Sequence, residues 1–113
     1  MNKDVSIFLE HILESIENIE EFLHDASKEV FLKNKEKQSA VIRQIEIIGE
    51  AVKNLPAHFR KKYPDVPWKD IAGMRDKLMH QYFGVDLETI WKVCEEDIPE
   101  LKQKLLSIKE QLE

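Results

Sequence analysis

Apolar residues recur three and four positions apart along most of this chain, and this spacing constrains the fold more than any other feature. In a first segment, from about Asp4 to about His24, the recurring positions are Val5, Phe8, Leu9, Ile12, Ile16, Ile19 and Leu23. In a second segment, from about Glu36 to Asn54, they are Val41, Ile45, Ile48, Val52 and Leu55. This spacing is typical of helices that pack on one side, and no stretch alternates as a strand would. The chain is therefore predicted to be all-α.

Caps and helix breakers set the remaining elements. Pro56 ends the second helix, and residues 57–67 are expected to be a connection with about one helical turn. A third helix starts near Trp68 and is stopped or bent at Gly84. Asp86 caps a last helix, whose apolar stripe stays in phase across Pro99, so one long helix kinked at Pro99 is predicted. We expect an antiparallel four- to five-helix bundle, a single domain over residues 1–113, with residues 25–37 as a polar connection.

Composition narrows the class of protein. The chain of 113 residues carries a net charge of −5, which argues against tight nonspecific binding of nucleic acid, although Lys and Arg cluster locally at 33–37, 60–62 and 75–77. Cys94 is the only cysteine, so an internal disulfide and a cysteine-based zinc site are both excluded. A charged start and the lack of a long apolar run predict a soluble, cytoplasmic protein outside the membrane. Four helices also offer more apolar surface than one small bundle needs, which favours a homodimer.

The stretch from Arg75 to Tyr82 is where the chemically capable side chains gather. Arg75 can hold a phosphate and stabilise the charge that builds on it during a reaction. His80 can take a proton from an RNA 2′-hydroxyl, or give one to the departing 5′-oxygen. Together they are sufficient for a metal-free reaction at a phosphodiester, with no cofactor. The alternative is that an Arg and a His in a charged helix are simply exposed to solvent.

The spacing of these residues raises a geometric question. At about 100° per residue, Arg75 and Tyr82 lie within about 20° of each other around a helix, whereas His80 lies about 140° from Arg75. Either the helix distorts before Gly84 and turns His80 towards Arg75, or a second subunit brings its own Arg75 and His80 across a two-fold axis, so that two copies build one composite site. We favour the second arrangement.

In these residues the chain resembles the HepT-like branch of the HEPN superfamily, whose signature is Arg-x4-His-x-Tyr. Arg75, His80 and Tyr82 match the signature, and Asp76 matches the polar residue often found after the Arg. The flanking blocks are similar too, and the resemblance covers nearly the whole chain: residues 47–51 and 63–68 before the motif, residues 83–86 and Trp91 after it.

The resemblance implies a function more specific than residue chemistry can give. Members of this branch are helical dimers with the motif at the interface, and they act as metal-independent ribonuclease toxins, with tRNA a reported type of target. The resemblance also implies a partner, a minimal nucleotidyltransferase antitoxin of the MntA type, which silences the toxin by attaching AMP to the Tyr, here Tyr82. A bulky anionic group two residues from His80 would crowd the site and repel RNA phosphate.

Other polar and aromatic residues carry weaker signals. Glu50 and Arg43 lie seven apart on the second helix, hence on one face. They either support the site by orienting Arg75 or a nucleotide, or form a purely structural pair, which we prefer. His11, His24 and His58 are expected on the surface, with no metal-site spacing. Trp68 and Trp91 are expected to be core or interface anchors, and Cys94 to be buried and inert.

Two other functions remain open on the sequence. The chain could be a non-catalytic partner that presents a nucleotide or substrate to a nucleotidyltransferase. It could also be a purely structural helical dimer, but that gives no reason for Arg75, His80 and Tyr82 to occur together. A neighbouring nucleotidyltransferase gene would argue against the purely structural dimer. Expression without that partner, comparing growth and tRNA integrity for the wild type and His80→Ala, separates the toxin from the non-catalytic partner.

Overall fold

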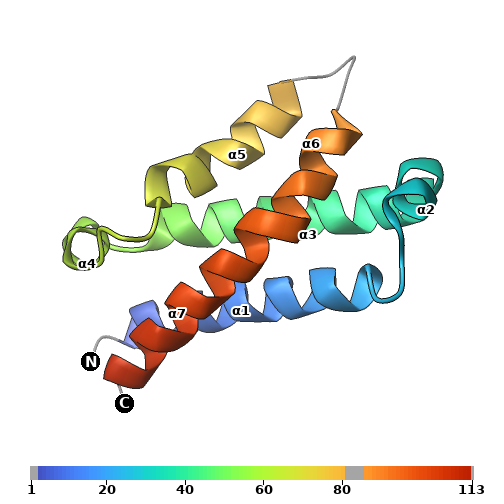
Figure 1. Cartoon of the computed structure of the whole chain (residues 1–113). Helices are drawn as coiled ribbons and strands as arrows, with labels where there is room; N and C mark the ends of the chain where they lie inside the picture. Colours follow the sequence, from blue (N-terminus) through green and yellow to red (C-terminus); the bar gives the residue numbers. More distant parts are fainter. Residues whose placement is uncertain (1–2, 81–85, 113) are drawn as a thin grey trace.

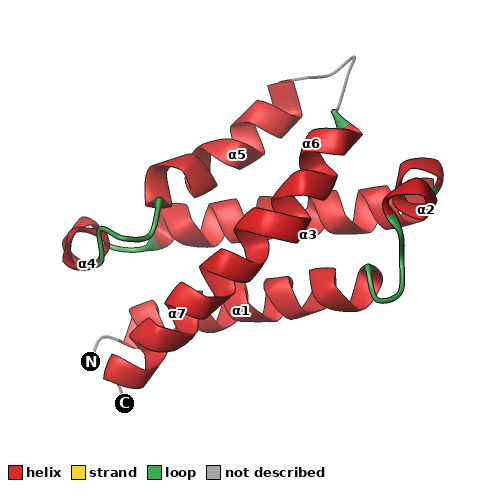
Figure 2. Cartoon of the chain, in the orientation of Figure 1, coloured by secondary structure: helices red, strands yellow, loops and turns green. Residues whose placement is uncertain are grey.

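The structure, a computed structural model, describes residues 3–80 and 86–112, with side chains for 5–74, 76 and 86–112. The described residues form helices joined by short loops and contain no strand, which confirms the predicted all-α class (Figures 1 and 2). The elements, in chain order, are α1 (Lys3–Phe22), α2 (Lys28–Lys33), α3 (Lys35–Asn54), α4 (Ala57–Lys62), α5 (Trp68–His80), α6 (Leu87–Lys92), a π-helical segment η1 (Val93–Asp97) and α7 (Ile98–Leu112). The helix expected to start near Trp68 does so, whereas Gly84 and Tyr82 lie outside the described residues.

Helix α3 is the centre of the bundle. It runs antiparallel to α1 on one side and to α5 on the other, and α7 crosses α1 diagonally (Figure 1). The apolar stripes of α1, α3 and α7 meet in one core. In these three helices the fully buried side chains include Ile12, Ile16, Ile19, Val41, Val52 and Leu105. The three-and-four spacing that predicted these helices therefore also identifies the faces they bury.

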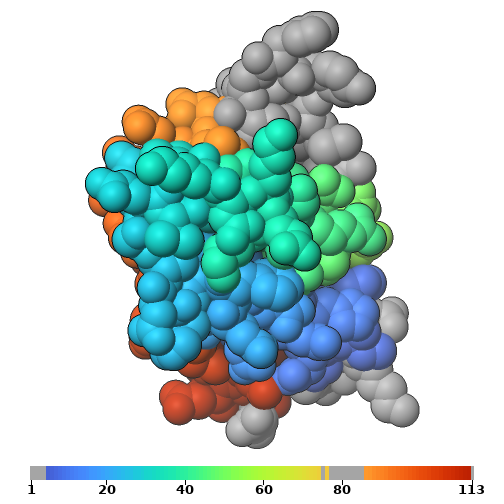
Figure 3. All heavy atoms as spheres, turned by 90° about the vertical axis from the view of Figure 1, so that its right-hand side faces the viewer, coloured from blue at the N-terminus to red at the C-terminus, as the bar shows by residue number. Residues whose placement is uncertain are grey.

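The segment expected to be a polar connection contains a helix of its own, which corrects the prediction. Ser27 caps α2 by accepting a hydrogen bond from the backbone N–H of Val30, 3.2 Å away. Phe31 then turns fully inward and packs on Trp91 with ring centroids 5.6 Å apart. In Figure 3, which views this end of the molecule, α2 covers the surface between α1 and α6. One buried residue in a six-residue helix leaves no periodic pattern to find in the sequence.

The connection between α3 and α5 is built around aromatic rings. It includes the expected short helix, α4, and its Phe59 lies 5.0 Å from Tyr63 and 6.1 Å from Trp68, measured between ring centroids. The indole Nε1 of Trp68 donates to the backbone oxygen of Tyr63 over 3.0 Å. Trp68 is thus the core anchor expected from the sequence, and this aromatic cluster fixes where α5 begins.

The last helix is continuous from Leu87 to Leu112, as the unbroken stripe predicts. Asp86 caps it, accepting hydrogen bonds from the backbone and the hydroxyl of Thr89, and the hydroxyl bond in particular lowers the pKa of this carboxyl. The irregularity lies in η1, where the N–H of Ile98 bonds to the carbonyl of Val93, in the turn that precedes Pro99. Pro99 has no N–H to donate, and a wider π turn accommodates that loss. Cys94 lies in this turn, and burial raises the pKa of its thiol to about 12, so it is in the protonated, unreactive form at neutral pH.

Candidate active site on helix α5

Helix α5 carries both predicted catalytic residues, and its backbone is α-helical from Trp68 through His80. Residues 75 and 80 therefore lie about 140° apart around the helix axis. Their side chains, and the whole of Tyr82, lie outside the part of the chain for which the structure gives side chains. The described neighbours of Arg75 show what surrounds its position: Met74 borders a cleft, and Asp76 faces α3.

The cleft beside Met74 lies between α3, α5 and α7 and has a volume of about 170 Å³. Its floor is apolar, and its rim is mostly acidic. The floor is formed by Ile45, Ile48, Ile71, Met74, Ile98 and Leu101. Asp70, Asp97, Glu100 and Lys104 form the rim, where Lys104 Nζ lies 3.1 Å from Glu100 Oε1. The sequence alone does not identify this rim, because Asp70 lies on α5 whereas Asp97 and Glu100 lie on the last helix, and only the packing of the two helices brings them together.

Asp76, predicted to support the site, ties α5 to α3. Its carboxylate accepts from Lys53 Nζ at 3.3 Å, and both side chains are close to half exposed. A solvent-exposed pair of this kind contributes roughly 0–1 kcal/mol to stability. Its main consequence is positional, since it holds the residue next to Arg75 against α3.

Arg43 and Glu50 lie on one face of α3, as their spacing predicts. Both line a shallow hollow of about 270 Å³ between α1 and α3, together with His11, Glu46 and Asn54. The ion pair of Arg43 is made with Glu46, whose Oε2 is 3.5 Å from Arg43 Nη1. The hollow therefore holds the two predicted supporting residues. It also holds His11, which no sequence pattern places beside them.

The remaining histidines are surface residues, as expected. His11, His24 and His58 are exposed, and His24 Nε2 lies 3.3 Å from the carboxylate of its neighbour Asp25. Within the described side chains, no group of three or more His, Cys, Asp or Glu residues is arranged to hold a metal ion. Across the same residues, no helix is long and apolar enough to cross a membrane.

Comparison with known proteins independently supports the family that the residues of the motif suggested. The family model described as "Ribonuclease HepT-like" matches residues 12–108. A Thermococcus cleftensis protein named as a probable ribonuclease HepT is 52% identical over 104 residues, covering 92% of this chain and 94% of its own. A Caldanaerobacter subterraneus protein named as a candidate RNase is 50% identical over 101 residues, covering 89% and 90%.

A longer relative shows that this domain also occurs joined to other sequence. A Methanocaldococcus jannaschii protein, named as a gamma-glutamylcyclotransferase and candidate RNase, is 57% identical over all 113 residues. The chain spans 51% of that protein. No solved structure matches the chain.

Proposed function

Because the chain belongs to the HepT-like ribonuclease family, we propose that it is a metal-independent endoribonuclease, formed by a single domain, with Arg75 and His80 as its catalytic residues. His80 acts as acid or base on the 2′-hydroxyl or the departing 5′-oxygen, and Arg75 holds the scissile phosphate. Cleavage of RNA by the purified protein in excess chelator tests the proposal. No cleavage of any RNA would instead favour the alternative, a non-catalytic nucleotide- or substrate-binding partner of a nucleotidyltransferase.

The regular α-helical backbone of α5 supports the site arrangement that we propose. Because the backbone is α-helical through His80, positions 75 and 80 lie about 140° apart around the helix axis, which argues against a site formed within one copy of the helix. We therefore place Arg75 of one copy opposite His80 of the partner subunit, in a homodimer with a two-fold axis. The cleft beside Met74, with its apolar floor, offers a surface on the same helix for the second copy.

The biological setting that we propose is a toxin–antitoxin pair in the cytoplasm. The toxin cuts RNA, with tRNA a candidate target, and an MntA-like nucleotidyltransferase silences it by attaching AMP to Tyr82. Tyr82 follows His80 by two residues, so the added phosphate lies near the catalytic groups. Its negative charge repels the RNA phosphate that Arg75 otherwise holds.

Replacing Tyr82 with Phe removes the acceptor hydroxyl, and we expect the variant to remain an active ribonuclease after incubation with the nucleotidyltransferase and ATP. The wild-type protein should gain the mass of AMP and lose activity in the same incubation. Intact-mass spectrometry and RNA cleavage measure the two effects. Tyr63→Phe is the matched control, because Tyr63 packs on Phe59 far from the motif in sequence, and it should still be modified. AMP found on Tyr82→Phe would contradict the assignment.

A further inference from the structure

Neighbours engage several of the positive charges on this acidic protein, but the positive charges around α4 have no acidic partner among the described residues. Ion pairs or carbonyl contacts engage seven cations elsewhere in the described residues: Lys28, Lys37, Arg43, Lys53, Lys102, Lys104 and Lys109. Among the described residues, Arg60, Lys61, Lys62 and Lys69 have no carboxylate within ion-pair distance. The same is true of Lys33 and Lys35 beside α2 and of Lys92 on α6, but the first four gather at α4 and the start of α5. We call these four residues the α4 basic edge. It is a local positive surface on a chain whose net charge is −5.

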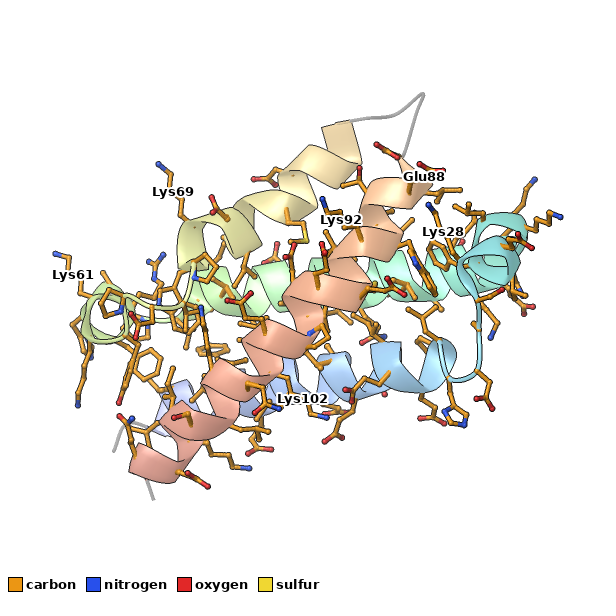
Figure 4. The ribbon with its side chains drawn as sticks, in the orientation of Figure 1. Lys28, Lys61, Lys69, Glu88, Lys92 and Lys102 are labelled. Carbon is orange, nitrogen blue, oxygen red and sulfur yellow. The ribbon has the colours of Figure 1, made fainter. Side chains whose placement is uncertain are left out.

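The basic edge borders a groove rather than a flat surface. The groove lies between α4 and the start of α5, is open to solvent and has a volume of about 460 Å³. Arg60, Lys61, Pro64, Trp68, Lys69 and Asp70 are among the residues that line it. Figure 4 shows Lys61 and Lys69 reaching out from the ribbon at the α4 end of the molecule. Three cations, Arg60, Lys61 and Lys69, and one acid, Asp70, thus line the groove.

The frame under these cations is rigid. Pro64 and Pro67 restrict the backbone, and the packed rings of Phe59, Tyr63 and Trp68 hold α4 against α5. The guanidinium of Arg60 is partly sunk into this frame, with its Nε buried and without a hydrogen-bond partner among the described residues. The Arg60 guanidinium, which is held in place before binding, therefore loses less conformational entropy when it meets an anion.

Helix electrostatics explain part of this cluster but not all of it. Arg60, Lys61 and Lys62 lie in the last turn of α4, where the helix dipole favours positive charge. Lys69, in contrast, lies in the first turn of α5, where the dipole disfavours a cation. A positive charge in that position is unfavourable for the isolated helix, so it calls for another role.

We propose that the α4 basic edge binds the phosphodiester backbone of the RNA substrate, away from the site of cleavage; this rests on the ribonuclease function proposed above. Lys69 and His80 lie on the same helix, 11 residues and therefore about 16 Å apart along its axis. A strand held at the groove can follow α5 to the catalytic residues. The protein thus recognises an extended RNA through its repeated phosphates, and a short fragment that reaches only His80 lacks these contacts.

The test is the double variant Lys61→Gln/Lys69→Gln, measured in steady-state cleavage of a long RNA over a range of salt concentrations. We expect KM to rise while kcat is unchanged. The slope of log KM against log salt should decrease by about 1.4. Each of the two single-strand phosphates that the variant no longer neutralises contributes about 0.7 to that slope. Lys33→Gln/Lys35→Gln is the matched control, since it removes the same charge from exposed residues at the α2 end of the molecule and should leave KM and slope at wild-type values.

Binding of an uncut probe separates this proposal from the function on which it rests. A DNA-substituted copy of the RNA lacks the 2′-hydroxyl, so its affinity is independent of cleavage. Weaker binding by the Lys61/Lys69 variant supports the basic edge even if the wild-type protein fails to cut RNA. Affinity, KM and salt slope equal to those of the Lys33/Lys35 control would overturn it. So would a variant that keeps its RNA affinity and loses binding to an acidic protein partner instead.

Discussion

Replacing His80 with Ala is expected to lower kcat for RNA cleavage by about 10²–10⁴-fold, the usual contribution of a positioned acid or base. Arg75→Ala should lower kcat by about 10²–10³-fold, because the charge that builds on the phosphate loses its main stabilising partner. Both residues lie on the third and fourth turns of α5, after the aromatic cluster that anchors its start. Neither change should therefore unfold the bundle.

The measurement is single-turnover cleavage of a structured RNA in excess chelator, with circular dichroism to verify that each variant is helical. His24→Ala is the matched control: its side chain is 80% exposed beyond the end of α1, and it should cut at the wild-type rate. A His80→Ala protein with wild-type activity would rule out His80 as the acid or base. Loss of activity in His24→Ala as well would point to a general effect of removing a histidine.

The largest expected loss of stability comes from Phe31→Ala, which should lower the free energy of unfolding by about 3–5 kcal/mol. Phe31 is fully buried, and its ring packs on Trp91. Removing it leaves a cavity where α2 meets α3 and α6. The remaining link between α2 and α6, from Lys28 to Glu88 over 3.8 Å, is exposed and weak (Figure 4).

Urea unfolding at a fixed protein concentration measures this effect, since an oligomer's stability depends on concentration. The neighbouring Val30→Ala is the control: Val30 is 47% exposed, and its loss should change stability by about 0.5 kcal/mol or less. If the two variants unfold at the same urea concentration, Phe31 is not the residue that anchors α2.

These residues also show how far the fold could be predicted from sequence. Long helices are predictable because each repeats its buried face many times, as Ile12, Ile16 and Ile19 do in α1. Asp86 was predictable as a cap because the interaction is local. Helix α2 was not, because its single anchor, Phe31, is defined by a partner 60 positions away in the sequence, Trp91. The π turn before Pro99 was not predictable either, since the apolar stripe continues through it.

The candidate site, like the fold, was predictable from the sequence only in part. Residue type and local spacing led to the prediction of Arg75 and His80, and the family resemblance to that of Asp76; spacing also placed Arg43 and Glu50 on one face of α3. Contacts between residues that are far apart in the sequence could not be predicted. The Asp76–Lys53 pair joins two helices, and Lys69 joins the α4 cations only once the aromatic cluster sets α5 against α4. A sequence pattern reports periodicity within one element, whereas these pairings depend on how two elements pack.

Mixing subunits of Arg75→Ala and His80→Ala tests whether two copies of the protein share each catalytic site. Each variant alone should be nearly inactive. After subunit exchange, half of the dimers combine one subunit of each kind, and one of their two sites then holds both wild-type groups. The mixture is expected to regain about a quarter of wild-type activity, by the statistics of a two-fold dimer. A mixture no more active than its separate components would contradict a shared site.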